Sequence, residues 1–365
     1  MLDIALKLIN KISESGFEAY IVGGFVRDYL LGLKSNDIDI CTNATPRELK
    51  EIFEDDLESN EDYGTVTIIY HNIRFDIATF RKDIGYNDNR RPDKVEYIDD
   101  LYEDLKRRDF SINTFCIDKD NNIIDYFNAK KDLDNRLIKC IGDPVTKFNE
   151  DALRILRCIR FATVLDFNID KDTEDAIFKC RSKIKNLSYY RKKEELDKIF
   201  ISKNSMYGIK LLLKYKLDKE LEIENLNKVK ESNNLIGVWA VLNCPKYPFT
   251  SVEKEQIKKI NEILDKNHLD PMNLYKYGLY INSVAGEIKG EDISKIAESY
   301  DNLVIEHRKD IDIDAEGIME IFNKKPGRYI NEIFELLENA ILYRRVKNNR
   351  EDIIKYIKNN YKMGE

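Results

Sequence analysis

The sequence lacks the patterns that identify several common classes of protein. Its six cysteines form no CxxC pair, so neither a zinc site nor a disulfide framework is indicated, and buried thiols in a reducing cytosol are expected. Its glycines form no Walker or Rossmann pattern. No apolar run reaches the roughly 18 residues of a membrane span, and the N-terminus is charged throughout. We therefore expect an untargeted, soluble, cytoplasmic protein.

The chain is rich in charged residues and is slightly acidic overall. The chain has 60 basic and 67 acidic residues in 365, a net charge of −7, which at first sight argues against a nucleic-acid partner. From Lys179 to Lys198, however, eight basic residues stand against three acidic ones. A solvated helix face is the commoner explanation of such a stretch, and a phosphate-binding surface is the alternative.

The length suggests two or three domains, and the hydrophobic pattern changes along the chain. Residues 17 to 140 mix short β-rich runs with helical stretches, which predicts an α/β domain. After about Gly142 the spacing of apolar residues is helical, so we expect an all-helical remainder and an α+β protein as a whole. Prolines indicate breaks near Pro144, between Cys244 and Pro248, and at Pro271.

Two aspartates, Asp37 and Asp39, stand two residues apart in a strand-like pattern. Their side chains should leave one face of the strand, with Ile38 and Ile40 in the core. Asp76 lies in a second strand-like stretch. Three carboxylates on paired strands suit Mg²⁺ and phosphoryl transfer, because oxygen ligands bind the ions that contact the attacking and leaving oxygens. An isolated Asp-x-Asp is more often a surface turn or an edge strand.

A Gly-Gly turn lies just before this pair in the chain. An apolar strand pattern runs into Gly23-Gly24 and then into a helix expected from Val26 to Leu31. Such a turn lets backbone N–H groups approach a triphosphate, with Arg27 to neutralise charge. A simple tight turn explains the glycines equally well.

Several motifs follow one another along the chain. They are GGFVRDYLLG followed by DIDI, Gly64-Thr65-Val66, DIATFR from Asp76 to Arg81, the loop residues Tyr86, Asp88, Arg90, Arg91 and Pro92, RRDFSIN from Arg107 to Asn113, and EDALRILRCIRFA from Glu150 to Ala162. Together they resemble one family, the class II tRNA nucleotidyltransferases (CCA-adding enzymes) and bacterial poly(A) polymerases of the polymerase-beta-like superfamily. A later stretch from Ser188 to Leu196 is similar to the family's SxERIxxEL segment, with Tyr190 and Lys192 in place of the usual Glu and Ile.

The resemblance implies three parts: a nucleotidyltransferase catalytic head (1–140), a helical neck with a nucleotide-selecting helix (141–200), and a helical body and tail that bind tRNA (201–365). Asp37 and Asp39 would bind Mg²⁺, and Asp76 would complete that site or help to deprotonate the RNA 3′-OH. The nucleotide-binding residues would be Gly23, Gly24, Arg27, Arg108, Asp109, Asn113, Asp151, Arg154, Arg157 and Arg160.

Within that set, the resemblance implies that Asp109 and Asn113 read the ribose and that Asp151 and Arg154 face the base edge of CTP or ATP. By spacing alone, the acids and arginines from Asp151 to Arg157 are as well explained by an exposed ladder of ion pairs on a helix. A basic turn before a strand, expected from Ile112 to Ile117, likewise accounts for the RRDF motif.

RNA contacts are expected from basic side chains in the helical part, through phosphate groups. The candidates are Lys185, Arg191, Lys192 and Lys193, together with Arg344, Arg345, Lys347 and Arg350 near the end of the chain.

The expected activity is template-independent addition of C, C and A from CTP and ATP to the 3′ end of tRNA, with release of pyrophosphate. A poly(A) polymerase and a partial, CC-adding or A-adding enzyme remain alternatives. A small-molecule adenylyltransferase would not need the EDxxR helix, and a non-catalytic RNA-binding protein would not need Asp37 and Asp39. Neither a membrane nor an obligate protein partner is indicated, and no histidine is followed by the aspartate that marks the phosphohydrolase domain of some related enzymes.

Overall fold

The computed structural model describes residues 1–35, 37–53, 57–60, 64–85, 94–232 and 234–362. The predicted loop residues Tyr86, Asp88, Arg90, Arg91 and Pro92 therefore lie outside the described residues. The chain forms two compact units, Met1–Asn227 and Lys228–Glu365.

The first unit begins with a mixed sheet of seven strands. Its strands are β1 (Ala19–Val22), β2 (Asp39–Thr42), β3 (Leu57–Asn60), β4 (Thr65–Tyr70), β5 (Ile73–Thr79), β8 (Cys116–Ile117) and β9 (Ile123–Ile124). They are ordered β3-β4-β5-β2-β1-β8-β9, and β2 and β5 pair in parallel while the other neighbours are antiparallel. A parallel pair needs a crossover, and the chain between β2 and β5 supplies it through α3 (Pro46–Phe53), β3 and β4.

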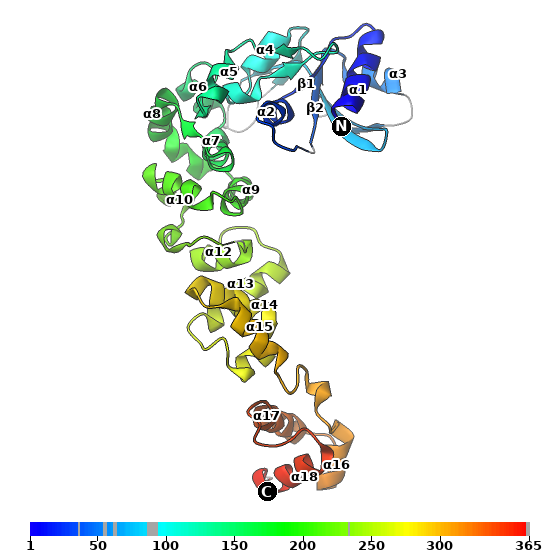
Figure 1. The fold of residues 1–365 in the computed structure, drawn as a ribbon, viewed down its shortest axis with the longest axis vertical. Coiled ribbons are helices and arrows are strands. Elements are labelled where there is room, and N and C mark those ends of the chain that lie inside the picture. The colour runs from blue at the N-terminus through cyan, green and yellow to red at the C-terminus, as the bar shows by residue number, and fades with distance from the viewer. Residues whose placement is uncertain (36, 54–56, 61–63, 86–93, 233, 363–365) are drawn as a thin grey trace. The chain divides into compact units, whose positions relative to one another are not determined.

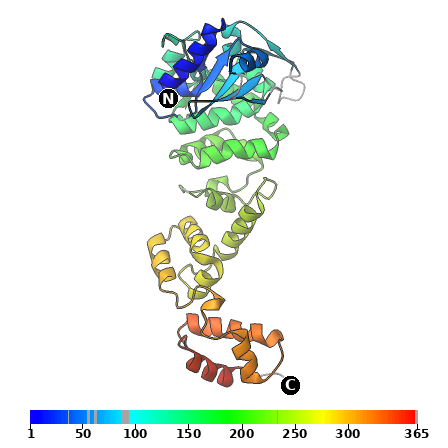
Figure 2. The same ribbon diagram turned by 90° about the vertical axis from the view of Figure 1, so that its right-hand side faces the viewer.

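Alternation of apolar residues fixes which side of β5 is buried. Phe75, Ile77 and Thr79 are each 0% exposed, so Asp76 lies on the opposite face of the strand, as predicted. Helix α1 (Leu2–Glu14) packs against β1 and α3 and covers part of the sheet, as Figures 1 and 2 show.

Short elements complete the head. They are α2 (Gly24–Leu30), the hairpin of β6 (Arg81–Ile84) and β7 (Lys94–Tyr97), α4 (Leu101–Lys106), the 3-10 turn η2 (Ser111–Asn113), α5 (Ala129–Asp134) and β10 (Leu137–Ile138).

Two of these elements differ from the prediction. The helix expected from Val26 begins two residues earlier, at Gly24, and the strand expected from Ile112 is present only at Cys116–Ile117. In the second case the Thr114 hydroxyl donates to the carbonyl oxygen of Ser111 at 2.7 Å. Such local hydrogen bonds compete with a strand ladder and favour the 3-10 turn.

The remainder of the first unit is helical. It contains α6 (Pro144–Glu150), α7 (Leu153–Leu165), β11 (Asn168–Ile169), α8 (Lys171–Cys180), η3 (Arg181–Asn186), α9 (Tyr189–Phe200), α10 (Ser205–Lys214), α11 (Leu217–Leu221) and η4 (Leu226–Lys228), the last of which crosses into the second unit. Asp143 caps α6 by accepting from Thr146 N, with Pro144 as its first residue, at the predicted break. The prediction of helix alone after Gly142 is wrong at β11, which pairs in parallel with β10 and is too short to show a period.

The second unit is helical in all its described elements: α12 (Leu235–Leu242), α13 (Ser251–Ile263), α14 (Pro271–Lys289), α15 (Ile293–Asp301), η5 (Arg308–Asp310), α16 (Ala315–Phe322), α17 (Arg328–Leu342) and α18 (Arg350–Asn360). The predicted breaks from Cys244 to Pro248 and at Pro271 fall between α12 and α13 and at the start of α14. Across the described residues, no helix has the length and apolar character that crossing a membrane requires. All six cysteines are buried, and none of them is in a disulfide.

The packing of α10 against α7 and α9 generates a prediction. A methyl group added at Gly208 would come within 2.5 Å of Thr163 Oγ1 and 2.6 Å of Ile199 Cγ2, both on fully buried side chains. Gly208→Ala should therefore lower the free energy of unfolding by about 1–2 kcal/mol, despite the better helix propensity of alanine. Urea unfolding measures this, with the exposed Lys210→Ala of the same helix as control. Equal stability of the Gly208 variant and the wild type would contradict this packing.

Candidate active site

The three predicted carboxylates meet at the centre of the sheet. Asp39 is the first residue of β2 and pairs in register with Asp76 of β5, so the two side chains share one face. Asp37 precedes β2 rather than lying within it, and Ile38 between the two acids is 1% exposed. The prediction that Asp37 is part of the strand is therefore wrong, although Asp37 still lies near Asp39.

The negative charges of these acids act on one another. The pKa of Asp39 is raised above its ordinary value, first by burial, then by the negative charge of Asp37, and to a smaller extent by Asp76; Arg108 opposes the rise. The Asp76 carboxylate also accepts a hydrogen bond from the Thr67 hydroxyl at 2.6 Å. Arg74 Nε also lies 3.8 Å from the Asp76 carboxylate. Three acids therefore stand against two nearby cations, Arg74 and Arg108, which leaves net negative charge on one face of the sheet.

A divalent cation fits this charge and this donor set, which consists of carboxylate oxygens. Among the residues that the structure describes, no three His, Cys, Asp or Glu side chains are grouped as a complete metal site. Mg²⁺ is usually held by one or two carboxylates, with its other ligands from water and substrate phosphates. The pair Asp37 and Asp39 meets that requirement.

The Gly-Gly turn lies beside the carboxylates. Gly23 has φ 80°, a conformation that favours glycine, and a Cβ there would lie 3.4 Å from Arg108 Nη1 and 3.8 Å from Asp39 Oδ2. The N–H of Gly23 donates to the carbonyl oxygen of Phe115 at 3.2 Å, which ties the turn to the sheet. The turn thus brings Gly23, the residue that precedes α2, next to Asp39.

A chain of hydrogen bonds joins four of the predicted nucleotide-binding residues and Asp28. Arg27 Nε and Nη2 donate to Asp28 at 2.8 and 2.7 Å, and its Nη1 donates to Asn113 Oδ1 at 2.7 Å. Asn113 Nδ2 donates to Asp109 at 3.1 Å, and Arg157 Nε donates to the other Asp109 oxygen at 2.7 Å. This chain connects α2, η2 and α7.

The charge of Asp109 depends on that chain. Burial by itself would raise the pKa of Asp109, but the Arg157 guanidinium and the hydrogen bond from Asn113 hold it at about 2. Asp109 is therefore an ionised, buried hydrogen-bond acceptor at neutral pH.

An aromatic ring, that of Phe161, lies among the arginines, a contact that the sequence motifs do not predict. Phe161 has the guanidinium carbons of Arg160, Arg27 and Arg157 at 4.3, 5.2 and 5.4 Å from its ring centre. Arg157 and Phe161 stand four residues apart on α7, so they share one face of the helix, and this spacing is the feature of the sequence that indicates their contact. The ring places three cations around one surface, with Phe110 edge-on at 5.8 Å between ring centres.

The EDxxR segment is not one continuous helix. Asp151 has φ −142° and ψ 108° and separates α6 from α7, so its predicted place on a helical stripe with Arg154 and Arg157 is wrong. One Asp151 oxygen accepts from the N–H of Leu153 at 3.0 Å, and such a bond favours a turn over a continued helix. The other accepts from Arg191 at 2.8 Å.

Arg154 is buried and faces the protein in this structure. It is 9% exposed, and it donates to Glu150 at 2.5 Å and to the carbonyl oxygens of Lys147 and Arg107 at 3.0 and 3.1 Å. Arg160 pairs with Glu195 at 3.0 Å. To contact a base, Arg154 would have to exchange one of these partners.

The four basic residues predicted to bind RNA differ in exposure. Lys192 is 2% exposed, with its ammonium against the Tyr189 ring, so its predicted RNA contact has no support here. Arg191 pairs with Asp151, and Lys193 pairs with Asp197 at 2.7 Å. Lys185 pairs with Glu220 at 3.3 Å, but its side chain is 61% exposed, the most open of the four.

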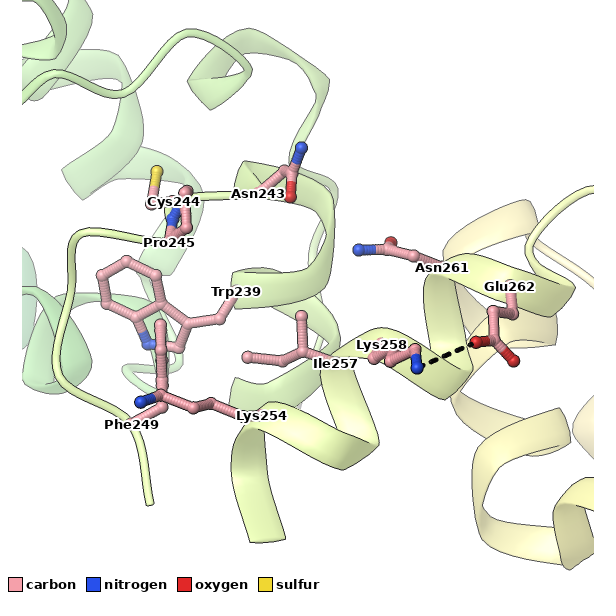
Figure 3. A pocket seen from close by; sticks show the side chains of 10 residues that line it. All are labelled: Trp239, Asn243, Cys244, Pro245, Phe249, Lys254, Ile257, Lys258, Asn261 and Glu262. Atoms are coloured by element: carbon pink, nitrogen blue, oxygen red, sulfur yellow. Dashed lines mark ion pairs between the residues drawn. The ribbon is translucent and has the colours of Figure 1, made fainter. Parts of the chain in front are cut away.

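A separate pocket lies in the second unit and contains none of the predicted site residues. Figure 3 shows the Trp239 and Phe249 rings and Ile257 on one side, with Lys258 paired to Glu262 at 3.8 Å. Its volume is about 540 Å³. The pocket has no carboxylate pair comparable to Asp37 and Asp39.

Comparison with known families agrees with this geometry. The "Poly A polymerase head domain" matches residues 19–139, "Probable RNA and SrmB- binding site of polymerase A" matches 166–224, and a tRNA nucleotidyltransferase domain 2 matches 240–357. Among solved structures, the Bacillus stearothermophilus CCA-adding enzyme in complex with CTP has a TM-score of 0.87 at 24% identity, covering 98% of this chain and 96% of that one. The Thermotoga maritima CCA-adding enzyme complexed with tRNA has a TM-score of 0.71 at 22% identity, covering 98% and 95%. These likenesses establish the fold, an α+β head followed by helices.

Curated relatives extend the likeness to the sequence. A CCA-adding enzyme of Ligilactobacillus salivarius is 34% identical over 97% of this chain and 95% of the relative. One from Lactococcus lactis is 36% identical over 97% and 96%. With the nucleotidyltransferase head matched and this identity sustained over almost the full length, the chain belongs to the family of the CCA-adding enzymes.

Proposed function

We propose that this chain adds C, C and A from CTP and ATP to the 3′ end of tRNA without a nucleic-acid template and releases pyrophosphate. The observation that carries the proposal is the register of Asp39 with Asp76, which lie close to Asp37 and to the Gly23 turn. A hydrogen-bonded network of arginines and Asp109 continues from that turn. The curated relatives, which are named for this activity, support it.

In this mechanism Asp37 and Asp39 would hold Mg²⁺. The bound ion would polarise the α-phosphate and neutralise charge on the leaving pyrophosphate. Asp76 accepts the proton of the RNA 3′-OH as its oxygen attacks the α-phosphorus, and the bond to the β-phosphate breaks. Arg108 stabilises the negative charge that develops on the phosphates, so catalysis comes mainly from positioning and electrostatics.

Nucleotide selection is assigned to the buried polar groups. Asp109, ionised and fixed by Asn113 and Arg157, accepts from the ribose 2′-OH and so favours NTP over dNTP. Asp151 and Arg154 face the base edge once Arg154 gives up Glu150, and offer the acceptor and donors that C and A match. A uracil or guanine would leave a buried polar group without a partner.

The helical part would bind the tRNA acceptor arm by its shape and phosphates. Lys185 is one contact. Exposed cations around the end of α17 and the start of α18 supply others, namely Arg344, Arg345, Lys347 and Arg350. We retain the division into a head (1–140), a neck (141–200) and a body with tail (201–365), and a cytoplasmic location, as proposals.

The test of this function is product length. Purified protein and Mg²⁺ are incubated with tRNA transcripts that end at the discriminator base, at C or at CC, with CTP and ATP separately and together. Three added nucleotides that end in A, and only with both substrates, are expected. A long A tail would indicate a poly(A) polymerase, CC or A alone a partial enzyme, and no incorporation would contradict the proposal.

Removal of one carboxylate should stop the reaction. Asp39→Asn is expected to lower the turnover rate at least about 1,000-fold, because loss of a group that acts only in the transition state costs several kcal/mol. Thermal unfolding should show an intact fold, since the substitution removes like-charge repulsion. The exposed Asp99→Asn in the head serves as control and should keep full activity. Retention of most activity by the Asp39 variant would remove this mechanism.

The ionisation of Asp109 makes a prediction about pH. Its pKa falls from the ordinary 3.8 to about 2 in the folded chain, so its charge adds roughly 2 kcal/mol of stability above pH 4, which is lost as the pH falls toward 2. Asp109→Asn should be less stable than the wild type by about that amount at pH 7, and the difference should shrink between pH 4 and 2. Denaturant unfolding at several pH values measures it. The half-exposed Asp175→Asn should show a small, flat difference, and a pH-independent gap for Asp109 would refute the assignment.

A further inference from the structure

A buried aspartate, Asp104, lies close to the RRDF motif and has no role in the proposed function. Asp104 is near the end of α4, with its side chain 1% exposed. One of its oxygens accepts from Arg107 Nη2 at 2.7 Å and from the backbone N–H of Arg81, the first residue of β6, at 3.2 Å. The other lies 3.5 Å from Arg108 Nη2. One carboxylate on α4 therefore contacts both the arginines of the RRDF motif and the start of the β6–β7 hairpin.

The Arg108 guanidinium points in two directions. Its Nη2 meets Asp104, while its Nη1 lies 3.4 Å from the position of a Cβ on Gly23, at the turn beside Asp39. Burial would lower the pKa of Arg108, but Asp104, and more weakly Asp39, raise it, so the group stays charged. Arg108 thus spans the space between Asp104 and the carboxylates that would hold the metal.

Geometry of this kind needs a fixed anchor. An arginine side chain loses rotamer freedom when it is fixed in one position, and Arg107 and Arg108 are adjacent like charges that would otherwise separate. A buried carboxylate that binds both removes the freedom and the repulsion together. It also accepts from the backbone N–H of Arg81, so the anchor is fixed to the start of the β6–β7 hairpin.

We infer that Asp104 is a positioning residue, which holds Arg108 against the triphosphate of the incoming nucleotide without touching that nucleotide itself. The inference rests on the proposed function, because it assigns the triphosphate as the ligand of Arg108. Since CTP and ATP share the triphosphate, Asp104 affects both nucleotides equally and does not select between bases.

A double-mutant cycle separates this role from a merely structural one. The variants are Asp104→Asn, Arg108→Ala and the two combined. Glu103→Gln is the matched control, because Glu103 precedes Asp104 on α4 and pairs only at the surface, with Lys106 at 3.0 Å. The measurements are the Kd of CTP, of ATP and of inorganic pyrophosphate with Mg²⁺ and without RNA, and the midpoint of thermal unfolding.

Asp104→Asn should weaken all three ligands by about tenfold, the lower end of the effect of removing a supporting partner in a site. In the Arg108→Ala background the same change should have almost no further effect, because Asp104 acts through Arg108. Glu103→Gln should bind like the wild type.

Two results would overturn the inference: wild-type affinity in Asp104→Asn, or losses that simply add in the double variant. If Asp104→Asn does not fold, Asp104→Glu is the second variant, because it keeps the charge but moves it by one methylene. It should fold and bind CTP and pyrophosphate several-fold more weakly than the wild type. Unchanged affinity of the Asp104→Glu variant would also contradict the inference. If the wild type binds CTP but does not extend tRNA, the proposed function is wrong. The positioning role of Asp104 is then still decided by the binding affinities of the variants.

Discussion

The parallel pairing of β2 with β5 is the constraint on which the site depends. It sets Asp39 opposite Asp76 in register, and with Asp37 beside them it holds three acids where they repel one another. Neighbouring carboxylates that were free to move would separate or take up protons. They stay because the opposite faces of the strands are locked in the core, with Ile40 and Ile77 at most 1% exposed. Hydrophobic burial thus keeps the three carboxylates together, and a divalent cation would relieve the repulsion between them.

A second network makes the head and the helices that follow it act as one unit. The hydrogen bonds from Arg27 through Asn113 and Asp109 to Arg157 cross from α2 to α7 inside the first compact unit. Phe161 lies beneath the guanidiniums and supplies a surface on which like charges can gather. Helix α7 is therefore held to α2 and η2 of the head by the same residues that are proposed to read the ribose.

Local periodicity predicted a large part of this arrangement. Alternation in β5 gave the exposed face of Asp76, and prolines with capping residues marked the starts of α6 and α14. Motif order gave the family. These features depend on residues within a few positions of each other, which is the range over which a pattern in sequence is informative.

What could not be predicted depends on contacts between distant residues. The break at Asp151 is stabilised by Arg191, forty positions later, and the burial of Lys192 follows from how α9 packs. Asp104 resembles any acid in a charged helix until the fold places Arg81, Arg107 and Arg108 around it. Strand β11 has two residues and no period, and its existence depends on β10 lying alongside.

The central claim is that Asp37 and Asp39 hold the cation that meets the triphosphate. Calorimetric titration of CTP in the presence of Mg²⁺ and in the presence of a chelator tests it directly, for the wild type and for the Asp37→Asn/Asp39→Asn double variant. We predict that Mg²⁺ strengthens CTP binding by about tenfold or more in the wild type and by little in the variant, because the carboxylates are the protein's share of the ligands. An equal gain from Mg²⁺ in both proteins would contradict the account.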